Sequence, residues 1–285
     1  MKNNRLLQIP PLPAVLLAII SVQAGAAIAK GLFPAIGPAS TASLRIGLSA
    51  VILFVANRPK LGKLTKVQWK AVAFYGLVLG AMNLIFYMAI KRIPLALGVT
   101  LEFIGPLLLA VLNSKKAMDY LWVLLAAIGI ALIAPWSEKG LDLIGVLLAL
   151  LAGGLWATYI VLGGKISKVM KGGDAVSVGM IFATLLVVPF GIGSGGFGNL
   201  TPGLLLMGAA LALLSSAIPF TLEMSALSQM PARTFSILMS LEPAVAALCG
   251  IVFLNEHLSL VEYCSVALVI IASAGATITS KRETL

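Results

Sequence analysis

Ten apolar segments, separated by short polar connections, make up most of this sequence. They cover roughly residues 13–29, 41–56, 69–90, 95–112, 120–135, 143–162, 176–191, 204–227, 234–254 and 260–279. About 20 apolar residues in a helix span the hydrocarbon core of a bilayer. Ten such helices use most of the 285 residues, so no separate soluble domain is expected.

The composition supports a membrane protein. Hydrophobic residues make up 60% of the chain and charged residues 11%, whereas soluble domains are about 45–50% apolar and about 25% charged. Within lipid, every backbone polar group must be satisfied internally, and apolar segments of this length do so as helices. We therefore predict an all-α membrane protein with ten transmembrane helices.

The first segment resembles a secretory signal peptide. Lys2 and Arg5 precede the apolar run, and residues 24–26 (AGA) resemble a cleavage site. The run nevertheless continues to about Ile28, and nine further segments follow. We therefore expect the segment to remain in the protein as its first membrane helix.

The basic residues alternate between the connections on the two sides of the predicted bundle. If the N-terminus is cytoplasmic, 15 of the 20 lysines and arginines fall on the cytoplasmic side. Cytoplasmic connections carry such an excess, so we expect both termini in the cytoplasm and the protein in the inner membrane. The net charge of +10 is thereby explained by topology, and no nucleic-acid partner is expected.

Two stretches of the chain resemble each other. Residues 93–106 and 230–243 each hold two prolines 12 positions apart, with a glutamate nearby. If five helices form one repeat, the odd number inserts the second copy upside down, as in many secondary transporters. We therefore predict two inverted five-helix repeats, residues 1–137 and 138–285, with a substrate site between them.

Three glutamates lie within apolar segments: Glu102, Glu223 and Glu242. A charge at the bilayer centre costs about 2.5–3.5 kcal/mol on insertion scales, so such residues usually face a bundle interior or a wet cavity. Pro106 and Pro243 each remove a backbone donor and free a carbonyl four residues back. These carbonyls are candidate acceptors for a substrate ammonium group. The alternative is that the prolines only bend helices for packing.

Arg45 is the basic residue most clearly inside an apolar segment. It could pair with Glu102, hold a substrate carboxylate, or extend to the outer interface of the membrane. Other polar or aromatic residues near the middle of segments are candidates to line a cavity. They are Gln23, Asn83, Tyr87, Trp156, Tyr159 and Ser240.

Several other signals do not support chemistry. The glycine-rich run 191–196 follows an apolar helix, where a dinucleotide-binding turn would follow a strand. His257 has no metal-ligand partners at useful spacing, and Cys249 and Cys264 both lie in apolar runs. We expect no metal, no cofactor and no enzymatic activity. An intramembrane enzyme would need a polar catalytic cluster, and a scaffold would not need paired intramembrane glutamates.

The chain resembles the drug/metabolite transporter superfamily, EamA type. The resemblance covers nearly the whole chain and is most specific in residues 231–260. It is carried by AIAKGLFPAIGPASTASLRIGL, FYGLVLGAMNLIFYMAI, LEFIGPLLLAVL, ATYIVLGGK and PARTFSILMSLEPAVAALCGIVFLNEHLSL. The small four-helix multidrug members of this superfamily carry a glutamate in helix 1, which this chain lacks, and this weakens an organic-cation substrate.

The resemblance implies export of small neutral amino acids, threonine and homoserine foremost, by alternating access. It also implies a central cavity framed by helices 3, 4, 6, 8 and 9. By position, this carries over to Asn83, Tyr87, Glu102, Trp156, Tyr159, Glu223 and Glu242, to which we add Arg45. Two questions stay open: whether protons drive transport, and whether the substrate is another metabolite or a drug.

Overall fold

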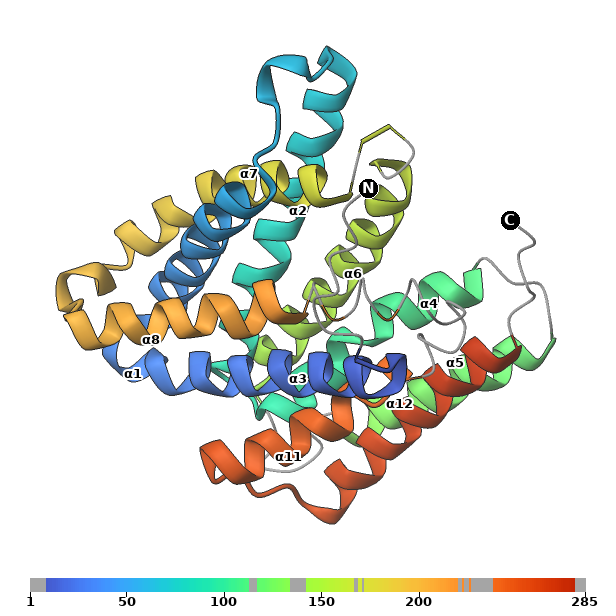
Figure 1. Ribbon diagram of the computed structural model, residues 1–285. Coiled ribbons are helices and arrows are strands. Elements are labelled where there is room, and N and C mark those ends of the chain that lie inside the picture. The colour runs from blue at the N-terminus through green and yellow to red at the C-terminus, as the bar shows by residue number, and fades with distance from the viewer. Residues whose placement is uncertain are drawn as a thin grey trace.

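The computed structural model describes residues 9–112, 117–133, 142–166, 169–170, 172–219, 222, 226 and 238–279. Throughout these residues the secondary structure is helical (Figure 1). The elements are α1 (Pro11–Asn57), η1 (Leu61–Lys63), α2 (Lys66–Ile90), α3 (Leu95–Glu102), α4 (Ile104–Leu112), α5 (Ala117–Ile133), α6 (Leu143–Ile166), α7 (Gly172–Gly193), η2 (Gly196–Asn199), α8 (Pro202–Ala212), the π-helical η3 (Leu213–Ala217), α11 (Glu242–Leu254) and α12 (Leu260–Thr279).

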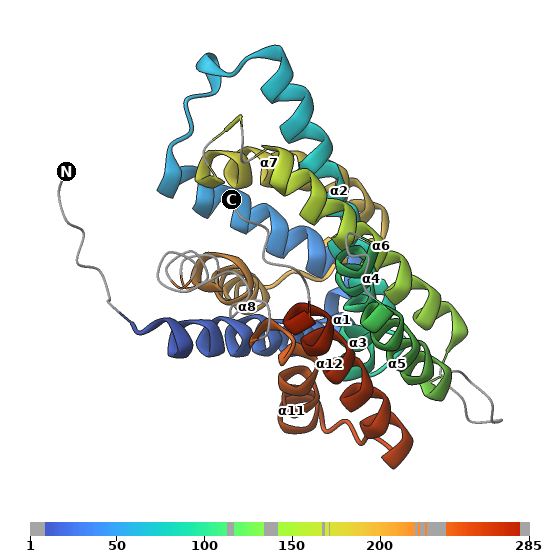
Figure 2. The ribbon, with the colours of Figure 1, turned by 90° about the vertical axis from the view of Figure 1, so that its right-hand side faces the viewer.

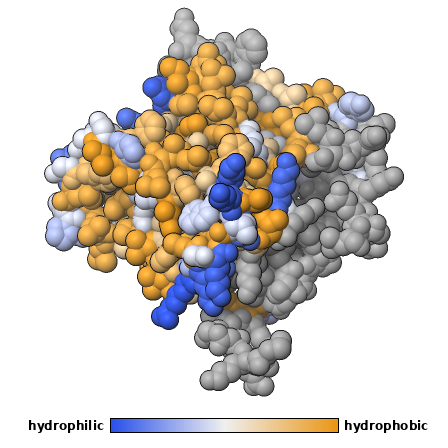
Figure 3. Space-filling model, turned by 90° about the horizontal axis from the view of Figure 1, so that it is seen from above, coloured by the Kyte–Doolittle hydropathy of each residue, from blue (hydrophilic) through white to orange (hydrophobic). Residues whose placement is uncertain are grey.

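The helices have the length and surface of a membrane protein. By length and composition, four described helices can cross a bilayer, namely α1, α2, α6 and the part of α7 at Gly173–Gly193. Shorter apolar helices accompany them. Figure 3 shows that most of the visible described surface is hydrophobic, with hydrophilic residues gathered in a few clusters. The chain is therefore a helical membrane protein, and the count of ten spans stays a prediction.

The first two predicted spans lie in the two halves of α1, and the break between them falls within the expected connection over residues 30–40, although most of that connection is helical. Helix α1 runs for 47 residues and is interrupted at Gly37, where φ is +74° and ψ is 163°. This backbone conformation suits glycine because a side chain would be strained there. Pro38 then begins the second half of α1, which runs back at an angle to the first (Figures 1 and 2). A single residue therefore reverses the chain.

The predicted span 95–112 is broken in its middle. The chain forms a turn at Phe103, between α3 and α4, three residues before Pro106. A similar turn at residues 240–241 immediately precedes α11, where Pro243 is the second residue. Because proline removes a donor and crowds the preceding turn, each break lies where the sequence makes a continuous helix costly.

Small residues let several helices approach closely. A Cβ atom built at Gly76 of α2 would lie 2.2 Å from the Gly179 carbonyl oxygen of α7. One built at Gly105 of α4 would lie 1.8 Å from the Gly153 carbonyl oxygen of α6. Small residues at helix contacts are typical of membrane bundles, where packing drives association. Helix α5 packs along α12 at the other side of the molecule (Figures 1 and 2).

Candidate functional site: a polar cavity between the helices

One cavity, with a volume of about 240 Å³, is enclosed by residues of α1, α2, α3, α6, α7, η3 and α11. It is lined by Val22, Gln23, Ala26, Arg45, Leu79, Met82, Asn83, Phe86, Tyr87, Val99, Glu102, Trp156, Tyr159, Met180, Ser215, Ser216, Met239 and Glu242. Pockets for drug-sized ligands are about 300–1,000 Å³. This cavity therefore suits a smaller molecule.

Seven of the eight residues predicted to bind substrate line this cavity. They are Arg45, Asn83, Tyr87, Glu102, Trp156, Tyr159 and Glu242. The eighth, Glu223, lies outside the described residues. Ser240, a further cavity candidate, does not line it: its hydroxyl lies 3.1 Å from that of Ser273 in α12. Whether the lining residues bind substrate stays a prediction.

Arg45 is held inside the protein by two neighbours from α2. Its guanidinium hydrogen-bonds the side-chain oxygen of Asn83 and lies over the ring of Tyr87, 5.0 Å from the ring centroid. Only 9% of Arg45 is exposed, so it does not extend to the membrane interface and that alternative is wrong. Asn83 is itself fixed by donating its amide to the Leu79 carbonyl, at 2.8 Å.

The two glutamates lie at the helix breaks. Glu102 is the last residue of α3, and Glu242 is the first residue of α11. Arg45 lines the same cavity as Glu102, but these two described residues form no ion pair. The cavity thus holds one guanidinium and two carboxyl groups at separate places.

The backbone carbonyl of Glu102, which Pro106 frees, lies against α6. A Cβ atom built at Gly153 of α6 would lie 2.5 Å from this oxygen. The absence of a side chain at Gly153 therefore leaves room for the carbonyl. Whether a freed carbonyl receives a substrate ammonium stays a prediction, and the carboxyl group is the other candidate.

Aromatic pairs form part of the cavity wall. Tyr75 and Tyr159 stack with ring centroids 4.9 Å apart, and the Tyr75 hydroxyl donates to that of Tyr159 at 2.9 Å. Phe103 meets Trp156 edge to face at 5.1 Å, next to the break after α3. These contacts fix the rings of Tyr159 and Trp156, which line the cavity.

The serines of η3 are cavity residues that the sequence analysis missed. Ser215 and Ser216 lie in a π-helical turn, a feature that occurs often at functional sites. The turn is braced from both halves of α1: Ser21 donates to the Leu214 carbonyl at 2.7 Å, and Ser49 donates to the Ser216 hydroxyl at 3.0 Å. The sequence feature that could have indicated them is a pair of adjacent serines inside the apolar segment 204–227.

Four buried polar side-chain atoms have no hydrogen-bond partner within the part of the chain that the structure describes. They are Gln23 Oε1, Arg45 Nε, Tyr87 Oη and Ser215 Oγ. All four atoms belong to residues that line this cavity. Leaving a buried polar atom unpaired costs about 1–3 kcal/mol, so their concentration here indicates a site for a polar ligand.

The site has no donor set for a metal. Among the described residues, no group of three or more His, Cys, Asp or Glu side chains could hold a metal ion. One guanidinium, two carboxyls, two amides and several hydroxyls instead match a small molecule that carries both charges. A zwitterion can place its carboxylate at Arg45 and its ammonium at an acid.

The chain is similar to known transporters. Residues 143–278 match the EamA-like transporter family. The threonine/homoserine exporter RhtA of Salmonella typhimurium (strain SL1344) is 40% identical over 96% of this chain and 93% of its own length. RhtA of Escherichia coli (strain K12) is 39% identical with the same coverage, and the uncharacterized transporter YwfM of Bacillus subtilis (strain 168) is 26% identical over 80% of this chain.

A solved crystal structure shares the fold. It superposes with a TM-score of 0.61 at 17% sequence identity, covering 96% of this chain and 99% of the other. At this identity the likeness concerns the fold alone.

Proposed function

The chain belongs to the EamA-like transporter family, and we propose that it exports small neutral amino acids, threonine and homoserine foremost, across the inner membrane. Its similarity to the threonine/homoserine exporters over nearly the full length supports this substrate class. The observation that carries the proposal is the concentration of unpartnered buried polar atoms around one cavity of amino-acid size.

The bound amino acid is oriented by its two charges. Arg45 receives the carboxylate, because Asn83 and Tyr87 hold its guanidinium in the cavity and leave Nε free to donate. A guanidinium suits this role because its planar fork matches a carboxylate. Glu102 receives the ammonium, with Glu242 as the second acid, since both line the same cavity.

The charges of the site give protons a role in the cycle. A carboxyl group can bind either the substrate ammonium or a proton, and a bound ammonium favours its ionised form. When the substrate leaves, a proton can take its place at the acid. In our proposal the substrate and the proton exchange at Glu102 and Glu242, while a facilitator without proton coupling is the alternative.

Alternating access follows from the two predicted repeats, residues 1–137 and 138–285. In inverted-repeat transporters, discontinuous helices meet at the substrate site near the bilayer midplane. The breaks beside Glu102 and Glu242 fit this arrangement. The two repeats rock about the cavity, with both termini in the cytoplasm. Substrates of drug size are a weaker alternative, because the cavity volume of about 240 Å³ is small for them.

The test is efflux of labelled threonine and homoserine from proteoliposomes that contain the purified full chain. We expect stereospecific efflux of both, accelerated by a pH gradient. Efflux that ignores the gradient would establish a facilitator. Absence of efflux from protein shown to be folded would refute amino-acid export and redirect the search to other metabolites.

A further inference from the structure

The π-helical turn and the first half of α1 form a wall of the cavity that the two charged groups of an amino acid do not use. Ser21 donates to the Leu214 carbonyl, which fixes α1 against the turn. One helical turn further along α1, a Cβ atom built at Gly25 would lie 2.2 Å from Ser215 Oγ. Gln23, two residues from Ser21 and from Gly25 along α1, lines the same cavity as Ser215.

Two polar atoms on this wall are unpartnered within the described residues. Gln23 is 3% exposed, and its Oε1 accepts no hydrogen bond. Ser215 Oγ is buried and has neither a donor nor an acceptor beside it. Gly25 permits this position of the serine hydroxyl, since any larger residue there would displace it.

The two atoms are complementary to one chemical group. An amide oxygen only accepts a hydrogen bond, whereas a serine hydroxyl can also donate one. An alcohol can donate to the first and accept from the second at the same time. A methyl group of the same size would leave both protein atoms buried and unpaired, which is the larger penalty.

We propose that Gln23 and Ser215 form a subsite for the side-chain hydroxyl of the substrate, and that it selects hydroxylated amino acids over their apolar isosteres. The inference rests on the proposed function and adds to it a basis for specificity. A site built to hydrogen-bond a hydroxyl rejects the analogue that lacks it far more strongly than an apolar pocket separates substrates by size. Threonine against valine, and homoserine against norvaline, are the matched comparisons.

The experiment measures the relative efflux efficiency of each pair in proteoliposomes that hold the full chain. We expect the wild type to prefer threonine over valine, and homoserine over norvaline, by at least tenfold. Ser215→Ala should lower both preferences about tenfold, mainly by slowing the hydroxylated substrates. Gly25→Ala, which leaves the serine in place but displaces its hydroxyl, should shift them in the same direction.

Ser265→Ala is the matched control. It removes a buried serine hydroxyl that donates to the Gly129 carbonyl in the contact between α5 and α12, away from the cavity. Its preferences should equal those of the wild type. If Ser215→Ala does not fold, the substrate preferences of the wild type and of Gly25→Ala still test the subsite.

Three results would overturn the subsite, and they differ in whether they also refute amino-acid export. Equal efflux of threonine and valine by the wild type, or unchanged preferences in folded Ser215→Ala, refutes the subsite and leaves amino-acid export intact. Absence of threonine and homoserine efflux refutes the subsite and the proposed function together.

Discussion

Arg45 is a buried basic residue within an apolar helix. A positive charge in a membrane interior needs neighbours that stabilise it, and Asn83 and Tyr87 provide a hydrogen bond and a ring face. Neither neighbour neutralises the charge. The guanidinium is therefore oriented and remains available for a carboxylate.

Arg45→Lys should lower threonine efflux at least tenfold while the protein stays folded. Lysine keeps the charge but lacks the planar guanidinium, which can donate to Asn83 and to a substrate carboxylate at the same time. Initial rates in proteoliposomes, at several threonine concentrations, measure the effect, which we expect mainly in KM. Wild-type efflux by the lysine variant would mean that a point charge suffices and that the orientation of Arg45 is unimportant.

At the scale of elements, the break between α3 and α4 places Glu102, and its position depends on α6. The Glu102 carbonyl fits against Gly153 because that residue has no side chain. The neighbouring Gly154 has nothing within 4 Å of its Cβ position. Alanine substitutions at these two adjacent glycines therefore distinguish the effect of close packing on stability from the effect of helix propensity.

Gly153→Ala should destabilise the protein by about 1–3 kcal/mol, because the added methyl group overpacks a rigid backbone contact. Gly154→Ala should be neutral or stabilising by up to about 1 kcal/mol, because alanine favours a helix and the site is open. Unfolding of each purified variant in the same detergent measures both. Equal stabilities of the two variants would contradict the close approach of α3 and α6.

The start of α6 is fixed by Asp142. Its side chain accepts hydrogen bonds from the Ile144 and Gly145 amides, and it pairs with Arg92 at 2.6 Å. The hydrogen bond from Arg92 holds the pKa of the Asp142 carboxyl below its usual value, with the two amides as further causes. A lowered pKa stabilises the fold above the unfolded-state value, about 4, and this contribution disappears as the pH falls through the lowered pKa.

Asp142→Asn keeps the capping oxygen but removes the charge. At pH 7 we expect a lower Tm than for the wild type, and the difference should shrink as the pH falls below about 4. Thermal unfolding at a series of pH values checks this. A Tm difference that is constant down to acid pH would show that the charge of Asp142 is not involved.

Some features of these elements could be predicted from the sequence, and others could not. Hydropathy and the positions of Arg45, Glu102 and Glu242 were visible in the chain, because polar residues are conspicuous in apolar segments. The reversal between the first two spans was expected, but its confinement to Gly37 and the π-helical turn at residues 213–217 were not. The π-helical turn is held by tertiary hydrogen bonds, from Ser21 and Ser49, that no local pattern specifies.

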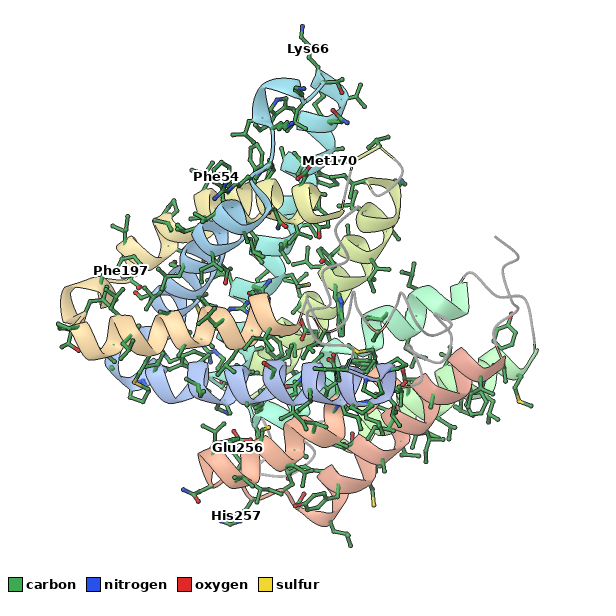
Figure 4. All side chains as sticks on the ribbon, in the orientation of Figure 1. Phe54, Lys66, Met170, Phe197, Glu256 and His257 are labelled. Atoms are coloured by element: carbon green, nitrogen blue, oxygen red, sulfur yellow. The ribbon has the colours of Figure 1, made fainter. Side chains whose placement is uncertain are left out.

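At the scale of the whole molecule, one polar cluster joins parts of the chain that are far apart in sequence. Lys30 of α1 pairs with Glu256, which follows α11, at 2.5 Å, and it also donates to the Ile93 carbonyl at 2.8 Å. The other Glu256 oxygen accepts from the Leu95 amide at the start of α3. Figure 4 shows Glu256 next to His257 in the connection after α11.

Lys30→Met should destabilise the protein by about 3 kcal/mol or more, because it leaves the largely buried Glu256 carboxylate without its counter-charge. Adding Glu256→Gln should recover part of the loss, since glutamine is neutral and still accepts from Leu95. A double-mutant cycle on unfolding free energies measures the coupling. Strictly additive changes in unfolding free energy would show that the ion pair between Lys30 and Glu256 does not contribute to stability.

Recognition of the amino-acid zwitterion is tested most directly by the binding of threonine and its blocked derivatives to the purified wild-type protein. Stabilisation by a ligand reaches about 2.7 kcal/mol at 100 times its Kd, so thermal unfolding reports binding. If Arg45 holds a carboxylate and Glu102 an ammonium, threonine raises Tm, whereas threonine methyl ester and N-acetylthreonine raise it far less. Equal stabilisation by all three compounds would contradict recognition of the zwitterion in this cavity.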